Sequence, residues 1–221
     1  MTVVFFDCDN TLLDNDRVRA DLDAFLQCEF GAGGAEQYWA HYDRLRVELG
    51  YADYLGAVQA MRPGSEGDPR LPLFSTFLLD YPFADRLYPG ALAALAHCRR
   101  WGTTAILSDG DVVFQPRKLR RSGLWDAVDG RVLILVHKEK MLDDVMQRYP
   151  AERYVMVDDK LTILTAMKAI WRDKLLTIWP RQGHYAHDVV ANAKLPAPDL
   201  TVEHIGELAH FDLSSLLREP R

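Results

Sequence analysis

The sequence predicts an α/β fold, a doubly wound parallel sheet that carries an inserted, small, all-helical domain. Short apolar runs alternate with helical patterns through residues 86–221, and one further run opens the chain. Polar residues follow these runs directly, as they do at the carboxyl ends of parallel strands. Residues 14–85 show helical spacing alone. We therefore expect a core of residues 1–13 and 86–221, with residues 14–85 as a helical insertion.

The first predicted strand is the apolar run of residues 3–6, which leads directly into Asp7, Cys8 and Asp9. Because side chains alternate along an extended chain, Asp7 and Asp9 point to the same side. Adjacent carboxylates repel each other unless a cation or hydrogen-bond donors neutralise them. The pair therefore predicts a bound metal or divided acid and base roles, with a turn that caps the next helix as the alternative.

The predicted insertion consists of amphipathic helices. Apolar residues recur at helical spacing over residues 18–26 and 38–49, and the glycine-rich residues 31–34 separate the two stretches. Further helices are expected over residues 52–61 and 74–79. Helices inserted directly after the first strand would suit a lid, and a layer packed permanently on the sheet is the alternative.

The second predicted strand, residues 103–107, leads into Ser108 and Asp109. A small hydroxyl beside exposed backbone N–H groups can bind a phosphoryl oxygen, although serine is also common in caps and turns. The next helix is expected to begin at Pro116, because proline suits the first helical position.

The third predicted strand, residues 131–136, is followed by Lys138 and Lys140. A lysine at this edge can neutralise an anionic oxygen and hold crowded carboxylates together. We favour Lys138 because it lies closer to the strand. A solvated lysine at the start of a helix is the alternative for either residue.

The fourth predicted strand, residues 154–157, ends at Asp158 and Asp159, and residues 175–179 and 200–202 form two more strands. If the first and fourth strands are neighbours, this acidic pair faces the first one. Carboxylates that converge without a metal repel each other strongly. Magnesium would remove that repulsion, because it is a hard cation that binds oxygen ligands.

Other polar residues have simpler interpretations. His184 and His187 have a spacing that zinc sites use, but no third ligand is apparent and an ordinary loop is expected. The basic residues 117–121 are expected to form a short helix with a solvated charged face. Four arginines of the insertion could bind a substrate or simply be solvated: Arg17, Arg44, Arg46 and Arg62.

Composition and charge narrow the class of protein. Hydrophobic residues make up 48% of the 221 residues and charged residues 26%, which is typical of an ordinary globular protein. A formal charge of −6 argues against nucleic acid as a partner, because affinity for a phosphate backbone comes from lysine and arginine. The opening apolar run is too short for a signal peptide or a membrane span, so we expect a cytoplasmic protein with no membrane contact.

Four motifs resemble, in order and spacing, those of the haloacid dehalogenase-like (HAD) hydrolase superfamily: Asp7-x-Asp9-x-Thr11, Ser108, Lys138 and Asp158-Asp159. The resemblance spans the chain and implies a Rossmann-like core with a helical cap inserted between the first and second motifs. Some relatives carry a further acid shortly after the acidic pair, where this chain has Ile163 and Leu164. One side chain that supports the metal in those relatives is therefore missing.

The resemblance also implies a role for each motif residue. Asp7 would be the nucleophile that forms an aspartyl-phosphate, and Asp9 the general acid and base. Ser108 and Lys138 would act with them as catalytic residues that hold the phosphoryl group. The residues implied to bind the phosphate are Thr11, Ser108, Asp109 and Lys138.

The implied cofactor is Mg²⁺, bound by Asp7, by the backbone carbonyl of Asp9 and by Asp159, with Asp158 binding directly or through water. The expected reaction is Mg²⁺-dependent hydrolysis of a phosphomonoester, with a small phosphorylated metabolite as the partner. The alternatives are a 2-haloacid dehalogenase, which would leave Asp9 and the acidic pair unused, and a non-catalytic binding protein that retains the fold.

Overall fold

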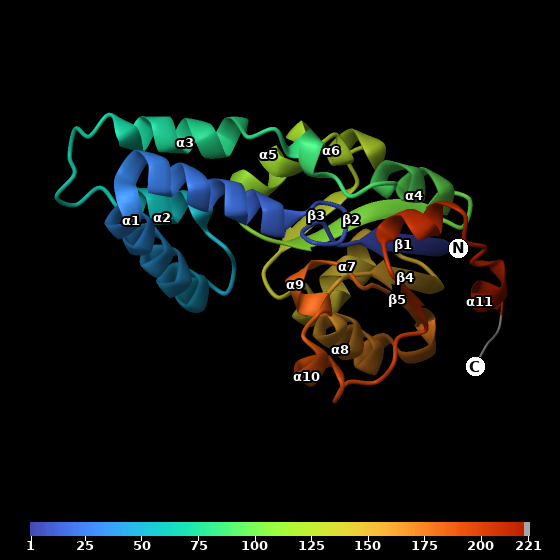
Figure 1. Cartoon of the computed structure of the whole chain (residues 1–221). Helices are drawn as coiled ribbons and strands as arrows, with labels where there is room; N and C mark the ends of the chain where they lie inside the picture. Colours follow the sequence, from blue (N-terminus) through green and yellow to red (C-terminus); the bar gives the residue numbers. More distant parts are fainter. Residues whose placement is uncertain (219–221) are drawn as a thin grey trace.

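The computed structural model describes residues 1–218, and in these residues six parallel strands form one sheet (Figure 1). The strands are β1 Thr2–Phe6, β2 Thr103–Asp109, β3 Val132–Leu135, β4 Arg153–Val157, β5 Leu175–Pro180 and β6 Leu200–Val202. Their order is β3-β2-β1-β4-β5-β6, so the direction of winding reverses between β1 and β4. The predicted doubly wound α/β fold is confirmed, and β1 and β4 are neighbours in it.

Helices cover both faces of the sheet, and β1 is therefore buried on both sides. Val4 and Phe6 belong to one apolar cluster, and Val3 and Phe5 to another. The first face carries α4 Ala91–Cys98, α5 Phe114–Arg121, α6 Leu124–Ala127 and the 3₁₀-helix η4 Ile205–Ala209. The second face carries α7 Leu142–Arg148 and α8 Leu161–Trp171.

Short elements complete the structure. They are the 3₁₀-helices η1 Phe83–Arg86, η2 Lys138–Lys140 and η3 Arg172–Lys174, and the helices α9 Gly183–Ala186, α10 Val189–Asn192 and α11 Ser214–Arg218. No helix within residues 1–218 combines the length and the apolar character that crossing a lipid bilayer requires.

Helices α1 Asn15–Leu49, α2 Tyr54–Ala60 and α3 Arg70–Asp80 lie together at one end of the molecule, on the left in Figure 1. Helix α1 bends at Gly31, whose φ of 70° and ψ of 177° interrupt the helical backbone. This bend lies in the glycine-rich stretch that was predicted to separate two helices. Only glycine adopts this backbone conformation without strain, and an added Cβ would contact nothing within 4 Å.

The inserted helices pack on α5 of the core. The ring centroids of Tyr54 and Phe114 lie 5.2 Å apart, and Arg117 forms an ion pair with Asp80 at 2.8 Å. Residues of both parts belong to the same apolar cluster. The domain boundaries near residues 14 and 85, and the function of the insertion as a lid, stay predictions.

Helix α5 begins at Phe114, two residues before the predicted start at Pro116. The carboxylate of Asp111 explains the difference, because its Oδ1 accepts the backbone N–H groups of Val113 at 2.8 Å and Phe114 at 2.6 Å. This side chain satisfies N–H groups that have no partner within the helix.

Candidate active site

The sheet brings the polar motifs to one edge. Strand β1 pairs with β2 and β4, and β2 pairs with β3, all in parallel, so their carboxyl ends lie side by side. The residues at these ends are Asp7, Asp9, Ser108, Asp109, Lys138, Asp158 and Asp159. The edge includes the reversal between β1 and β4, which is where open α/β sheets bind ligands.

Asp7, Asp158 and Asp159 form a buried carboxylate cluster, in which one oxygen from each lies within 4.8 Å of the others. Neither carboxylate oxygen of Asp159 has a hydrogen-bond partner among residues 1–218. Burial, together with repulsion from Asp158 and Asp7, raises the pKa of Asp159 well above its usual value. A buried carboxylate without partners is costly, and a hard cation would remove the cost. This donor set therefore fits Mg²⁺.

Lys138 neutralises part of this cluster. Its buried ammonium lies 2.5 Å from Asp7 Oδ1 and 2.7 Å from Asp158 Oδ2, and it donates to the carbonyl oxygen of Leu107 at 3.2 Å. Burial raises the pKa of Asp7 to about 7, and the positive charge of Lys138 opposes the shift. Lys140, the alternative in the sequence, is exposed. The structure places Lys138, and not Lys140, in contact with both carboxylates.

Asp109 fixes the turn that carries Lys138. Its Oδ1 accepts the backbone N–H of Lys138 at 2.8 Å, where η2 begins. His137, the preceding residue, has a φ of 58°, which is uncommon for a residue other than glycine. One oxygen of Asp109 therefore supports this turn.

Thr11 and Ser108 are buried, and both hydroxyls have protein partners. Thr11 Oγ1 accepts the backbone N–H of Asp159 at 2.9 Å, which joins the loop after β1 to the loop after β4. Ser108 Oγ accepts a hydrogen bond from Gln115 Nε2 at 3.1 Å. The oxygen of the Asp109 backbone is 3.5 Å from the Ser108 hydroxyl, a long contact that leaves its proton able to donate to another acceptor.

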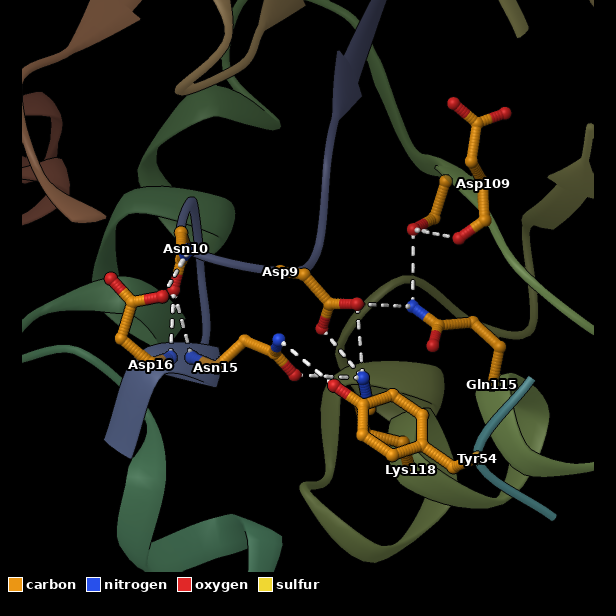
Figure 2. A network of polar contacts seen from close by, with 9 residues as sticks. Asp9, Asn10, Asn15, Asp16, Tyr54, Asp109, Gln115 and Lys118 are labelled. Carbon is orange, nitrogen blue, oxygen red and sulfur yellow. Dashed lines mark hydrogen bonds and ion pairs between the residues drawn. The ribbon is translucent and has the colours of Figure 1, made fainter. Parts of the chain in front are cut away.

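Asp9 is bound by a buried lysine. Lys118 Nζ lies 2.8 Å and 2.9 Å from the two carboxylate oxygens of Asp9, and 1% of the lysine side chain is exposed (Figure 2). The same ammonium donates to Asn15 Oδ1 at 3.2 Å, and Gln115 Nε2 lies 3.4 Å from Asp9 Oδ2. Asn15 in turn contacts the hydroxyl of Tyr54. Asp9 is thus connected through Lys118 to the first residue of α1 and to α2.

The prediction of a short helix with a solvated charged face over residues 117–121 holds for Arg117, Arg120 and Arg121, which are exposed, and is wrong for Lys118, which is buried. Helix α5 contacts the sheet and the insertion with one face only. Its buried stripe consists of Phe114, Gln115, Lys118 and Leu119. Arg121 donates to the backbone oxygens of Tyr81 and Asp80, at the end of α3. The stripe has helical spacing, and it is the signal that would have placed Lys118 inside.

A second cation escaped the sequence analysis. Lys160 follows the acidic pair directly and is half-buried. Burial lowers its pKa, but the charges of Asp7, Asp158 and Asp159 outweigh burial and raise it. The signal available in the sequence was its position beside the acidic pair.

Replacement of Lys118 with Met is expected to reduce both stability and activity. The substitution keeps the apolar stem but leaves Asp9 without its ammonium partner, and the Asp9 side chain is 31% exposed. We expect a loss of about 1–3 kcal/mol in the free energy of unfolding. Because Asp9 loses its fixed position, we expect kcat to fall by roughly 10–100-fold. Denaturant unfolding and steady-state kinetics measure the two effects.

The matched control for Lys118→Met is Arg117→Met on the same helix, because Arg117 is 43% exposed and pairs with Asp80. This surface pair should contribute less than about 1 kcal/mol. If Lys118→Met behaves like Arg117→Met in both measurements, Lys118 does not position Asp9.

A cavity of about 480 Å³ borders Asp9 and lies between the insertion and the core. The insertion contributes Arg19, Tyr42, Arg46 and Tyr54, and the core contributes Lys160 and Tyr185. Arg46 Nη2 donates to the hydroxyl of Tyr185 at 2.6 Å across the cavity wall. A cavity of this size suits a small molecule.

The arginines of the insertion differ in their positions. Arg17 and Arg44 pair with acidic residues four positions along the helix, and Arg62 borders a different cavity. Arg46 is the one of the four predicted candidates that lines the cavity beside Asp9. Arg19, which the sequence analysis did not single out, also lines it.

Residues Gly183–Ala186 form helix α9, where a loop was predicted, and His187 follows it directly. His184 Nδ1 lies 2.6 Å from Asp16 Oδ1, and within residues 1–218 no group of three metal-binding side chains includes either histidine. Gly183 explains how close α9 comes to the loop after β1. It has a φ of 73°, and an added Cβ would lie 2.5 Å from Cβ of Asn10.

Residues 1–170 match the family model described as haloacid dehalogenase-like hydrolase. Among solved structures, a proposed haloacid dehalogenase-like hydrolase of Burkholderia xenovorans shares 61% sequence identity with a TM-score of 0.89, over 96% of this chain and 98% of that chain. No match was found among curated proteins.

Two more distant structures show a likeness of fold. The L-2-haloacid dehalogenase of Xanthobacter autotrophicus, with chloropropionic acid covalently bound, is 21% identical with a TM-score of 0.58, over 99% of both chains. The proposed HAD-hydrolase YfnB of Bacillus subtilis, bound to magnesium, is 17% identical with a TM-score of 0.59, over 95% of this chain and 97% of that chain.

Proposed function

The chain belongs to the haloacid dehalogenase-like hydrolases, and we propose that it is a magnesium-dependent phosphomonoester hydrolase that acts on a small metabolite in the cytoplasm. One observation carries the proposal. Three buried carboxylates converge on one point beside a single buried lysine, and Asp159 has no hydrogen-bond partner within residues 1–218. Such a set suits a dianionic substrate that arrives with a divalent cation.

In this mechanism Asp7 attacks the phosphorus atom, and the alcohol leaves on the opposite side. Lys138, 2.5 Å from Asp7 Oδ1, favours the ionised form of the nucleophile against the effect of burial and offers its charge to a phosphoryl oxygen. The Ser108 hydroxyl donates to a second phosphoryl oxygen. Asp9 protonates the leaving alcohol and then takes a proton from the water that cleaves the aspartyl-phosphate.

Asp7, Asp158, Asp159 and the backbone carbonyl of Asp9 would hold Mg²⁺. Bound there, the cation would neutralise the negative charge of the phosphoryl group during transfer. Asp158 already accepts the backbone N–H of Lys160 at 2.8 Å and lies beside Lys138. The free oxygens of Asp159 are therefore the side-chain donors that depend most on the cation.

A 2-haloacid dehalogenase is the alternative within the family. That reaction also needs an aspartate nucleophile, but it requires neither a proton donor at Asp9 nor a cation. The buried charges of Asp158 and Asp159 would then destabilise the fold without contributing to catalysis. A non-catalytic binding protein would likewise have no catalytic use for these buried charges.

Two assays test the proposal. One measures hydrolysis of an aryl phosphate with and without Mg²⁺, and the other measures release of chloride from 2-chloropropionate. We expect aryl phosphate turnover that excess chelator abolishes and Mg²⁺ restores, and no chloride release. Chloride release without phosphate release would assign the dehalogenase reaction. Full phosphatase activity in excess chelator would refute the proposal that the reaction depends on a metal ion.

Replacement of Asp159 with Asn should raise the Mg²⁺ concentration for half-maximal activity by at least about 10²-fold, whereas Asp158→Asn should raise it less. The reason is that Asp158 has protein partners and Asp159 has none within residues 1–218. Without Mg²⁺, Asp159→Asn should raise the melting temperature, because a buried unpaired charge is removed. Thermal melts with and without Mg²⁺ measure this directly, and a lower melting temperature in the metal-free variant would contradict the assignment.

A further inference from the structure

Two arginines of α1 line the cavity beside Asp9, and their charges are not neutralised by a carboxylate within residues 1–218. Arg19 has neither a hydrogen bond nor an ion pair in this part of the chain. Arg46 donates to the neutral hydroxyl of Tyr185. An unneutralised guanidinium in a cavity attracts an anionic ligand.

Arg19 differs from Arg17 and Arg44 of the same helix, because it does not pair with the acid four residues further along. Arg17 pairs with Asp21 at 3.1 Å, which is the ordinary spacing for such a pair. The corresponding acid for Arg19 is Asp23. Its carboxylate instead accepts the indole N–H of Trp39 at 2.7 Å, so Arg19 keeps its charge free.

The side chain of Arg19 is also held in place. Its guanidinium carbon lies 3.8 Å from the centroid of the Trp39 ring and 5.3 Å from that of Tyr42. Stacking on a ring fixes the guanidinium plane but uses none of its N–H donors. Because Asp23 fixes Trp39, the whole platform is preorganised to bind an anion through the edge of the guanidinium.

Five carboxylates border the same cavity, and within residues 1–218 none of them forms an ion pair with Arg19 or Arg46. Asp9 is bound by Lys118, and Asp16 is bound by His184. Asp43 is exposed. These groups therefore leave the charge of the two arginines available to a ligand.

We propose that the substrate carries a second anionic group, a carboxylate or a second phosphate, and that Arg19 binds it together with Arg46. The proposal rests on the proposed phosphatase function, because it assumes that the transferred phosphoryl group lies at Asp7. The cavity of about 480 Å³ borders both Asp9 and Arg19, so one small molecule can reach from the proposed general acid to the arginines.

The test uses probes that differ in the second charge. The first pair is 4-carboxyphenyl phosphate and its neutral amide, 4-carbamoylphenyl phosphate. The second pair is 1,4-phenylene bisphosphate and 4-hydroxyphenyl phosphate. We expect kcat/KM to be roughly 10–100-fold higher for the charged member of at least one pair, mainly through a lower KM. The pair that responds identifies the anion as carboxylate or phosphate.

Arg19→Met should reduce the charged-to-neutral ratio of kcat/KM to near one, and Arg19→Lys should restore part of it, because lysine keeps the charge but loses the planar donor edge. Arg17→Met is the matched control, since Arg17 points to Asp21 and does not line the cavity. It should leave the ratio unchanged. Turnover with a ratio near one in both pairs for the unmodified protein would overturn the inference and leave the phosphatase function standing.

A binding measurement separates failure of the inference from failure of the function. Two non-hydrolysable probes are used, 4-carboxyphenylphosphonate for a carboxylate and phenylene-1,4-bisphosphonate for a second phosphate. Binding is followed by the fluorescence of Trp39, whose contribution is found by comparison with Trp39→Phe. We expect saturable binding that Arg19→Met weakens by at least about tenfold. If no phosphomonoester is hydrolysed, this result still supports the anion site. Equal affinities in Arg19→Met and the unmodified protein would overturn it.

Discussion

Asp7→Asn is expected to abolish hydrolysis of every phosphomonoester, with a loss of at least about 10⁴-fold in kcat, and to prevent formation of a phosphoenzyme. The amide cannot act as the nucleophile, and its oxygen can still accept the hydrogen bond from Lys138, so the site should keep its shape. Rapid quench with substrate labelled in the phosphoryl group, followed by peptide mapping, measures both effects. Label should appear on the unmodified protein at Asp7.

Asp14→Asn is the matched control for this substitution. The Asp14 side chain accepts the backbone N–H of Arg17 at 2.9 Å and caps α1, a role that asparagine performs equally well. Activity and label should therefore be unchanged in the control. Label on Asp9 in place of Asp7, or steady hydrolysis by Asp7→Asn, would refute the nucleophile.

The fold and the position of the acidic motifs could be predicted from the sequence because both depend on local patterns. Apolar runs such as residues 3–6 and 154–157 can be buried on both faces only as inner parallel strands. The acids that follow must then lie at the same edge, provided that the two strands are neighbours. That pairing is a property of the whole sheet, and the structure supplies it.

Lys118 shows what local patterns miss. Its neighbours Arg117, Arg120 and Arg121 suggest a solvated face, and a lysine is rarely buried without a partner. The partner is Asp9, 109 residues away in the sequence. The many basic residues in this segment therefore predicted the wrong environment for Lys118. The helical spacing of Phe114, Lys118 and Leu119 was the better indication that the lysine is buried.

Arg19 was missed for a related reason. Its spacing to Asp23 is that of an ordinary helical ion pair, like the spacing from Arg17 to Asp21, which does form one. The competing donor is Trp39, which lies beyond the bend at Gly31 and reaches Asp23 only because the helix folds back there. A bend can be expected from glycines, but the contacts that it creates cannot.

Asp9→Asn is expected to separate the two chemical steps according to the leaving group. An aryl phosphate can depart without protonation, so this variant should still phosphorylate Asp7 but should hydrolyse the intermediate about 10²–10⁴-fold more slowly. Label should then accumulate on the protein. An alkyl phosphate needs a proton to leave, so with that substrate the first step should also fail. Rapid quench with the two labelled substrates measures each step.

The surroundings of Asp9 make this variant a clean test. Lys118 donates to both carboxylate oxygens, and in Asp9→Asn the amide oxygen keeps one of these bonds once the amide nitrogen turns away from the ammonium, so the variant removes a charge and a proton carrier but keeps part of the geometry. Lys118→Met keeps the Asp9 carboxylate but removes the hydrogen bonds that hold it in position. If Asp9 acts as the acid, the aspartate variant should show a much larger penalty for alkyl than for aryl phosphate, whereas the lysine variant should slow both substrates by more similar factors. Equal penalties on both substrates in Asp9→Asn would mean that Asp9 only supports the site and that the proton comes from another group.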